Sequence, residues 1–282
     1  MAIPLPGEIG QRARDVLAGR VPVVPARDAA TVVVLRDGPL EVYLLRRKAT
    51  MAFAAGAYVF PGGSVDPRDA DHAVAWAGPS PREWGAVFGA DERTARGLVC
   101  AAVRETFEES GVLLAGPSAT TIVADTTGDD WEADRLALIA HELSFAEFLD
   151  RRGLVLRSDL LRPWAHWITP EIETKRFDTR FFVAALPPGQ RTRDVGGEAD
   201  MVAWMPPAAA LDRAAAGEIM LMPPTFSTLA EMSEFEAVGD VLRADRVITT
   251  IQPSAAEVDG EMVLIVPDAG QLAGQGDGGG GR

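Results

Sequence analysis

The chain has 282 residues, of which 47% are hydrophobic, enough to bury one large core or two modest ones. Its formal net charge of −14 argues against sequence-independent nucleic-acid binding, because such proteins need a basic stripe. The single cysteine, Cys100, excludes an internal disulfide framework and fits a reducing compartment. No run approaches about 18 apolar residues and the N-terminus lacks a signal-peptide pattern, so we expect a soluble, cytoplasmic protein without membrane contact.

The N-terminal part of the chain predicts an arm followed by a hairpin. Residues 1–28 carry scattered prolines and arginines and predict a short helix around 9–18, then a linker. The β-branched segment 29–35 predicts a strand, Arg36-Asp37-Gly38-Pro39 a hairpin turn, and 41–46 the returning strand. Both strands are nearly continuous apolar runs, which is typical of strands covered on both faces.

Three cations, Arg46, Arg47 and Lys48, follow the second strand directly. They form either a solvated strand end or an anchor for substrate phosphates, and the pattern leaves both open. Further on, residues 60–63 read Phe-Pro-Gly-Gly, and glycines without Cβ atoms let the backbone approach a phosphate or a metal ion. The segment 64–90 has no clear periodicity and predicts loop and short helix.

A predicted helix begins after Asp91 and ends at Ser110. Glu105, Glu108 and Glu109 occupy positions i, i+3 and i+4, so the helix stacks three carboxylates on one face. Like charges at this spacing destabilise an isolated helix unless a cation shares them. Hard divalent cations take oxygen ligands, and Mg²⁺ in particular is held by a few carboxylates and substrate phosphates.

Two neighbours favour a metal site over a solvated acidic helix face. Arg104 can hold one of the carboxylates in place with a bidentate contact. Gly111 stands where the helix must end in a left-handed turn, which fixes the last turn and the carboxylates on it.

The second half of the chain predicts alternating helices and strands. The expected elements are a marginal strand over 120–124, helices over 130–142 and 144–153, strands over 164–169, 177–186 and 201–204, and amphipathic helices over 206–217 and 224–242. Glu198 lies on a glycine-rich loop just before the last of these strands. The tail from about 270 has low complexity and predicts disorder.

The segment 104–112 reads RETFEESGV and resembles the second half of the Nudix box, G-x5-E-x7-R-E-U-x-E-E-x-G-U, where U is a bulky apolar residue. The Phe-Pro-Gly-Gly of 60–63 resembles the entry to that box. Without a gap, Ala90 and Arg96 fall where the box has its first glycine and first glutamate. The order of entry, insertion and second half is similar to that of the peroxisomal coenzyme A diphosphatase-like Nudix proteins and their bacterial relatives, and the similarity covers about 29–245.

This resemblance implies the Nudix α/β/α sandwich, an α/β (α+β) fold with a mixed sheet, helical insertions and a C-terminal helical extension. The expected domains are an N-terminal arm over 1–28, a Nudix hydrolase domain over 29–245 and a C-terminal segment over 246–282, disordered from about 270. The Nudix domain contains an insertion at about 64–90 and a helical segment at about 130–153.

The resemblance also implies a metal-dependent hydrolase in which water attacks one phosphorus of a diphosphate. Coenzyme A or acyl-coenzyme A is the favoured substrate. The alternatives are ADP-ribose, NADH or a nucleotide sugar, or a degenerate Nudix module that binds a nucleotide without cleaving it. The partner is a small-molecule diphosphate, with no nucleic acid and no membrane, and a homodimer is left open.

The expected site residues fall into three groups. They are Glu105, Glu108, Glu109, Arg104 and Glu198 for catalysis; Arg46, Arg47, Lys48, Phe60, Gly62 and Gly63 for substrate binding; and Glu105, Glu108, Glu109 and Gly63 for Mg²⁺ or Mn²⁺. Glu109 and Glu198 are both candidates for the general base, and the residues do not decide between them.

Overall fold

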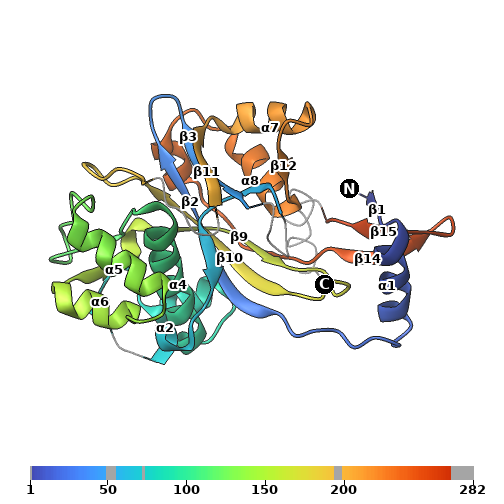
Figure 1. Cartoon of the computed structure of the whole chain (residues 1–282), viewed down its shortest axis with the longest axis horizontal. Coiled ribbons are helices and arrows are strands. Elements are labelled where there is room, and N and C mark those ends of the chain that lie inside the picture. The colour runs from blue at the N-terminus through green and yellow to red at the C-terminus, as the bar shows by residue number, and fades with distance from the viewer. Residues whose placement is uncertain (1, 49–54, 72–73, 194–198, 268–282) are drawn as a thin grey trace, which may run out of the picture.

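The computed structural model of the chain describes residues 2–48, 55–71, 74–193 and 199–267. A mixed sheet of nine strands runs through the molecule and carries helices on both faces, which is the expected α/β/α arrangement (Figure 1). The strands of this sheet are β2 (Arg27–Arg36), β3 (Glu41–Arg47), β4 (Ala57–Val59), β5 (Gly62–Ser64), β9 (Arg162–Ile168), β10 (Phe177–Ala185), β11 (Ala199–Met205), β12 (Met220–Leu221) and β13 (Thr250–Ile251).

The strand order is β12-β4-β3-β2-β10-β9-β13, with β11 also paired to β3 and β5 paired to β2. The central strands β2 and β10 are parallel, whereas β3 and β9 run antiparallel to their central neighbours. Residues 32–35 and 182–184 of the central pair are fully buried. The continuous apolar runs therefore correspond to strands covered on both faces, as predicted.

The first core lies between one face of the sheet and a group of helices that includes the acidic helix. The helices on this side are α2 (Pro67–Asp71), α3 (Pro81–Phe88), α4 (Glu92–Ser110), α5 (Asp129–Ile139) and α6 (Phe145–Arg152). Val32 and Val34 of β2 point into this core together with Phe107 of α4. The rings of Trp84 and Phe88 pack on Phe182 there, so these two aromatic residues of the insertion serve packing.

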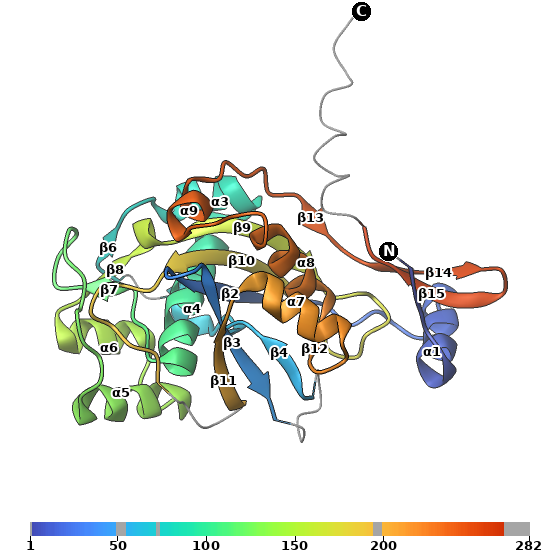
Figure 2. The same cartoon turned by 90° about the horizontal axis from the view of Figure 1, so that it is seen from above.

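The second core lies on the opposite face of the sheet. Its helices are α7 (Pro207–Ala215), α8 (Pro223–Met232) and α9 (Val238–Arg243). Val33 and Leu35 of β2 point into this core, because successive side chains of a strand alternate between its faces. The two views show α4, α5 and α6 on one side of the sheet and α7 and α8 on the other (Figures 1 and 2).

The first described strand and the last two pair in a small separate sheet. Strands β1 (Ala2–Pro4), β15 (Glu261–Ile265) and β14 (Ser254–Val258) pair in that order beside α1 (Gly7–Leu17). This unit lies at one end of the molecule in both views (Figure 2). A third sheet joins β6 (Trp76–Ala77), β8 (Val155–Arg157) and β7 (Ala115–Gly116), and a 3-10 turn (Ser158–Leu160) follows β8.

Two expected elements are wrong. Residues 120–124 form no strand: the Val123 N–H donates to the Ala115 carbonyl, while the Val123 carbonyl accepts from the Gln190 side chain in place of a strand partner. The single helix expected over 224–242 is two helices, α8 and α9. Asp37 from the β2–β3 turn accepts the N–H of Val238, 2.9 Å away, and so starts α9 from outside the local sequence.

The length and composition of the helices bear on whether the chain could span a membrane. Within the four described ranges, no helix combines the length and the apolar composition needed to cross a bilayer.

Candidate active site

Helix α4 carries the predicted site, and its two ends are capped as the sequence predicts. The Asp91 carboxylate accepts a hydrogen bond from the backbone N–H of Thr94, 2.9 Å away. At the other end Gly111 adopts a left-handed conformation with φ of 74°, and its N–H donates to the Phe107 carbonyl. The helix, with Glu108 and Glu109 in its last turn, therefore ends where the local sequence predicts.

Arg104 is the centre of the site. Its side chain is buried, and its Nη1 donates to the carboxylates of Glu105 and Glu108 at 2.8 and 3.2 Å. Its Nη2 donates to Asp69 and to the Ser64 carbonyl, both at 3.0 Å. One guanidinium thus contacts three carboxylates and anchors the strand that follows the Phe-Pro-Gly-Gly turn.

Asp69 is a site residue that the ungapped box alignment missed. Its side chain is 2% exposed and accepts from both Nε and Nη2 of Arg104. The missed signal is a spacing: five residues separate Gly63 from Asp69, as in the G-x5-E of the Nudix box. The insertion thus follows this acidic position. Arg96, where the ungapped alignment puts the box glutamate, lies 3.8 Å from Glu92 instead.

A glycine on α4 allows α2 to bring Asp69 to Arg104. A Cβ atom built on Gly97 would lie 2.9 Å from the side chain of Val65 and 3.2 Å from that of Ala70. Any larger residue would push α2 away from α4. The close packing of the two helices therefore depends on Gly97.

The two glycines of 60–63 lie directly against the acidic helix. A Cβ on Gly63 would lie 2.5 Å from the Glu105 carboxylate, so a side chain there would displace Glu105. The N–H of Gly62 donates to Glu109, 2.8 Å away. Phe60 is 3% exposed and packs into the second core, on the other face of the sheet. The turn therefore presents backbone, and not an aromatic ring, to the carboxylates.

Burial dominates the electrostatics of this cluster. Burial, opposed by Arg104 and reinforced by Glu108, raises the pKa of Glu105 to about 7. Burial also raises the pKa values of Glu108 and Asp69, again against the attraction of Arg104. Three carboxylates share one guanidinium, so the cluster is short of positive charge when all of them are ionised.

The donor set fits a divalent cation in its chemistry. No set of three or more His, Cys, Asp or Glu side chains is arranged as a metal site in the described part of the chain. In this arrangement Arg104 lies among its three carboxylates, and Glu109 is turned toward Gly62. Carboxylate oxygens are the ligands that Mg²⁺ prefers, and the charge deficit is of the sign that a cation offsets. The metal-binding role of Glu105, Glu108, Glu109 and Gly63 stays a prediction.

The basic run, which is Arg46, Arg47 and Lys48, does not lie on one face of the sheet. Tyr43 and Leu45 of β3 point into the first core and Leu44 into the second, so by alternation Arg47 belongs to the face of α4 and Arg46 to the opposite face. Arg46 pairs with Tyr58, which lies in the second core. Lys48 follows the end of β3, and Glu198 lies outside the described residues. Their predicted roles in binding and catalysis remain untested.

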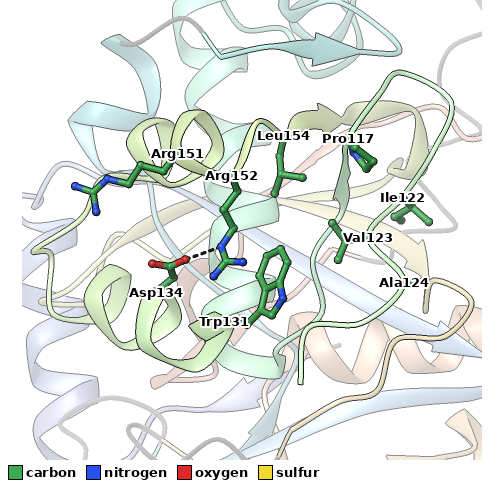
Figure 3. Close-up of a pocket in the computed structure, with 9 residues that line it drawn as sticks. All are labelled: Pro117, Ile122, Val123, Ala124, Trp131, Asp134, Arg151, Arg152 and Leu154. Carbon is green, nitrogen blue, oxygen red and sulfur yellow. Dashed lines mark hydrogen bonds and ion pairs between the residues drawn. The ribbon is translucent and has the colours of Figure 1, made fainter. Parts of the chain in front are cut away.

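An open cavity of about 650 Å³ lies between α5, α6 and the segment 117–124 (Figure 3). The guanidinium of Arg152 lies 3.6 Å from the ring centroid of Trp131 and is held by Asp134. Trp131 in turn packs edge-on against Phe107 of α4. None of the residues that line the cavity is a predicted site residue, so this cavity is separate from the carboxylate cluster.

Comparisons with known proteins agree with this arrangement. The family model described as the NUDT19 Nudix domain matches residues 91–232, just over half of the chain. A protein from Gallus gallus named acyl-coenzyme A diphosphatase NUDT19 is 27% identical over 270 residues, covering 76% of this chain and 70% of that protein. The Homo sapiens protein of the same name is 28% identical over 235 residues, covering 70% of this chain and 62% of that protein.

A solved structure shares the fold as well. The crystal structure of a NUDIX hydrolase from Alicyclobacillus acidocaldarius matches with a TM-score of 0.64 and 29% identity, covering 79% of this chain and 98% of that one. The chain spans less than two thirds of the human relative's length. The family model, the fold and the acidic helix together place this chain in the Nudix hydrolases, in the family described as the NUDT19 Nudix domain.

Proposed function

We propose that this chain hydrolyses the diphosphate linkage of coenzyme A or acyl-coenzyme A, with Mg²⁺ or Mn²⁺ held at the carboxylates of α4. The observation that carries the proposal is the buried cluster in which Asp69, Glu105 and Glu108 share Arg104 beside Gly63. The name acyl-coenzyme A diphosphatase, which the relatives carry, supports the substrate class.

The cluster supplies what a diphosphatase needs from its protein. When bound, a divalent ion lowers the pKa of water and offsets charge on phosphoryl oxygens. Glu105, Glu108 and Glu109 are the side chains that would hold it, and Arg104 fixes the first two of them. Because Gly63 has no Cβ atom, the Glu105 carboxylate can lie directly against the backbone there.

In the proposed reaction, the oxygen of a water molecule bonds to one phosphorus, and the bond from that phosphorus to the bridging oxygen breaks. A carboxylate, Glu109 or Glu198, takes the proton of the water. The bridging oxygen leaves with the other phosphoryl group. From coenzyme A the products are 3′,5′-ADP and a phosphopantetheine.

The test is a substrate panel with Mn²⁺ that contains coenzyme A, an acyl-coenzyme A, ADP-ribose, NADH and a nucleotide sugar, with the products separated by chromatography. We expect the two coenzyme A compounds to be cleaved fastest and to give 3′,5′-ADP. Chelation of the metal should stop their cleavage. Faster cleavage of ADP-ribose, NADH or the sugar nucleotide would keep the reaction and replace the substrate. Binding without cleavage of any compound would identify a non-catalytic module.

A further inference from the structure

The last turn of α4 is held by hydrogen-bond donors from outside the helix. The final carbonyl groups of a helix lack intrahelical partners. The Glu108 carbonyl accepts from Nη1 of Arg135 at 2.6 Å, and the Ser110 carbonyl accepts from the backbone N–H of Arg193 at 2.8 Å. The Gly111 carbonyl accepts from the hydroxyl of Thr126 at 2.7 Å. The end of the acidic helix is therefore fixed by tertiary contacts.

A single carboxylate on α5, that of Glu132, binds the side chains of two of these residues, Arg135 and Arg193. Glu132 accepts from Nε and Nη2 of Arg135 at 2.8 and 2.6 Å, in a bidentate contact. It also accepts from Nη1 of Arg193 at 2.6 Å. Arg135 is only 4% exposed, so its guanidinium has little freedom to leave the Glu108 carbonyl.

Glu108 is consequently held by hydrogen bonds at two groups, its carboxylate and its backbone carbonyl. Arg104 binds its carboxylate and Arg135 binds its backbone carbonyl. A small rotation or shift of the last turn would move the carboxylates of Glu108 and Glu109 away from Gly62 and its neighbour. Groups that orient metal ligands in this way commonly change metal affinity when they are removed.

We propose that Arg135, oriented by Glu132, is a positioning residue that holds the last turn of α4 in the register required for metal binding by Glu108 and Glu109. This inference rests on the proposed function, because it concerns the same carboxylates. It assigns to the helical segment 129–152 a part in the active site, although the segment contributes no predicted ligand to that site.

The test measures the affinity of the full-length chain for Mn²⁺ by electron paramagnetic resonance, in the absence of substrate. Arg135→Met removes the donor and keeps much of the side-chain volume, and we expect its Kd for Mn²⁺ to rise about tenfold. Its kcat should fall by a similar factor, recover as Mn²⁺ is raised, and leave KM little changed. Arg135→Lys, which keeps one donor and the charge, should recover part of the loss.

The matched control is Arg246→Met. Arg246 likewise bridges a helix carboxylate and a backbone carbonyl, those of Glu231 on α8 and Trp164, at 2.7 and 3.0 Å. It lies on the second-core side of the sheet, so its loss should lower Tm without changing the Kd for Mn²⁺. Glu132→Gln, at a partly exposed position, provides a second test if Arg135→Met does not fold.

Three outcomes separate the two proposals. A tenfold weaker Kd in Arg135→Met and an unchanged Kd in Arg246→Met support the positioning role. Equal Tm losses with the wild-type Kd in both variants, and in Glu132→Gln, overturn that role and leave the proposed function standing. A folded wild-type chain that binds no Mn²⁺ overturns the metal-dependent function, and the positioning role with it.

Discussion

The two faces of the sheet bury charge in different ways. On the face of α4, Asp69, Glu105 and Glu108 share the one guanidinium of Arg104. On the opposite face, Glu231 and Arg246 form a one-to-one pair. Both sites pair carboxylates with an arginine, but only the first holds more carboxylates than cations.

This difference indicates which buried charges are functional. A paired buried charge is a structural feature, whereas uncompensated buried charge is strongly destabilising unless something offsets it. The surplus on α4 therefore points to a ligand of positive charge, and the balanced pair on α8 does not. Perturbed pKa values cluster at functional sites for the same reason.

The largest expected effect comes from removing one carboxylate on each face. Glu108→Gln should lower kcat/KM about a hundredfold or more, because in the proposed mechanism Glu108 is a ligand of the metal that polarises the phosphoryl oxygens. Glu109→Gln should behave in the same way. Glu231→Gln, at the balanced pair, should retain activity. Steady-state assays with Mn²⁺ and circular dichroism of all three variants check this, and full turnover in both α4 variants would refute the assignment.

The next effect concerns Asp69, the carboxylate that precedes the insertion and reaches Arg104 from α2. Asp69→Asn keeps the size of the side chain and removes its charge, so Arg104 loses one of its three partners. We expect activity to fall about tenfold, the lower end of the range for a group that orients metal ligands. Asp66→Asn is the matched control, because the Asp66 carboxylate pairs with Arg68 and its backbone N–H, which donates to Asp69, is kept in the variant. Equal losses in the two variants would show that Asp69 has no special role.

A third prediction uses the pKa of Glu105, which burial raises to about 7. With that pKa the ionised fraction rises from about one tenth at pH 6 to about nine tenths at pH 8, so Mn²⁺ affinity should rise about tenfold over this range. Without metal, the folded state binds a proton on Glu105 that the unfolded state has already lost above its ordinary pKa. The contribution of Glu105 to stability therefore declines as pH rises toward about 7.

Calorimetric titration at pH 6, 7 and 8 checks the affinity, and thermal unfolding of the metal-free chain checks the stability. In Glu105→Gln, both pH dependences should weaken. A Kd for Mn²⁺ that is constant from pH 6 to 8 in the wild-type chain would contradict the raised pKa.

A smaller effect is expected from the basic run, which the strand alternation divides between the two faces. Arg47→Ala, on the face of α4, should raise KM for coenzyme A several-fold, since a charge-assisted contact to phosphate contributes about 1 kcal/mol or somewhat more. It should spare dephospho-coenzyme A if Arg47 reads the 3′-phosphate. Arg46→Ala, on the opposite face, should change neither value. Equal changes in the two variants would indicate that the basic run is a solvated strand end and does not bind the substrate phosphates.

The smallest effect is expected at Arg96. Its side chain lies 3.8 Å from Glu92, and Asp69 occupies the acidic position beside Arg104. Arg96→Glu should therefore change activity by less than about twofold, as is usual for surface substitutions away from special features. The assay is the same as for Glu108→Gln, and a large gain of activity would mean that the site lacks a carboxylate.

Local rules account for much of the acidic helix. Asp91, Gly111 and the spacing of the glutamates act over at most a few residues, so the sequence predicts the bounds of α4 and the shared face of its carboxylates. The central strands follow from equally local apolar runs. The same rules fail at 224–242, because Asp37 starts α9 from a distant turn.

The local sequence thus predicts the helix, its caps and the acidic residues on it. The tertiary fold brings in the groups that surround them: Asp69 reaches Arg104 across 35 residues, and Arg135 reaches the Glu108 carbonyl across 27. It also decided that Phe60 packs in the second core. The physical reason for this division is the sequence separation over which each interaction acts. Caps and periodicity act within a few residues, whereas burial and charge depend on segments that only the folded chain brings together.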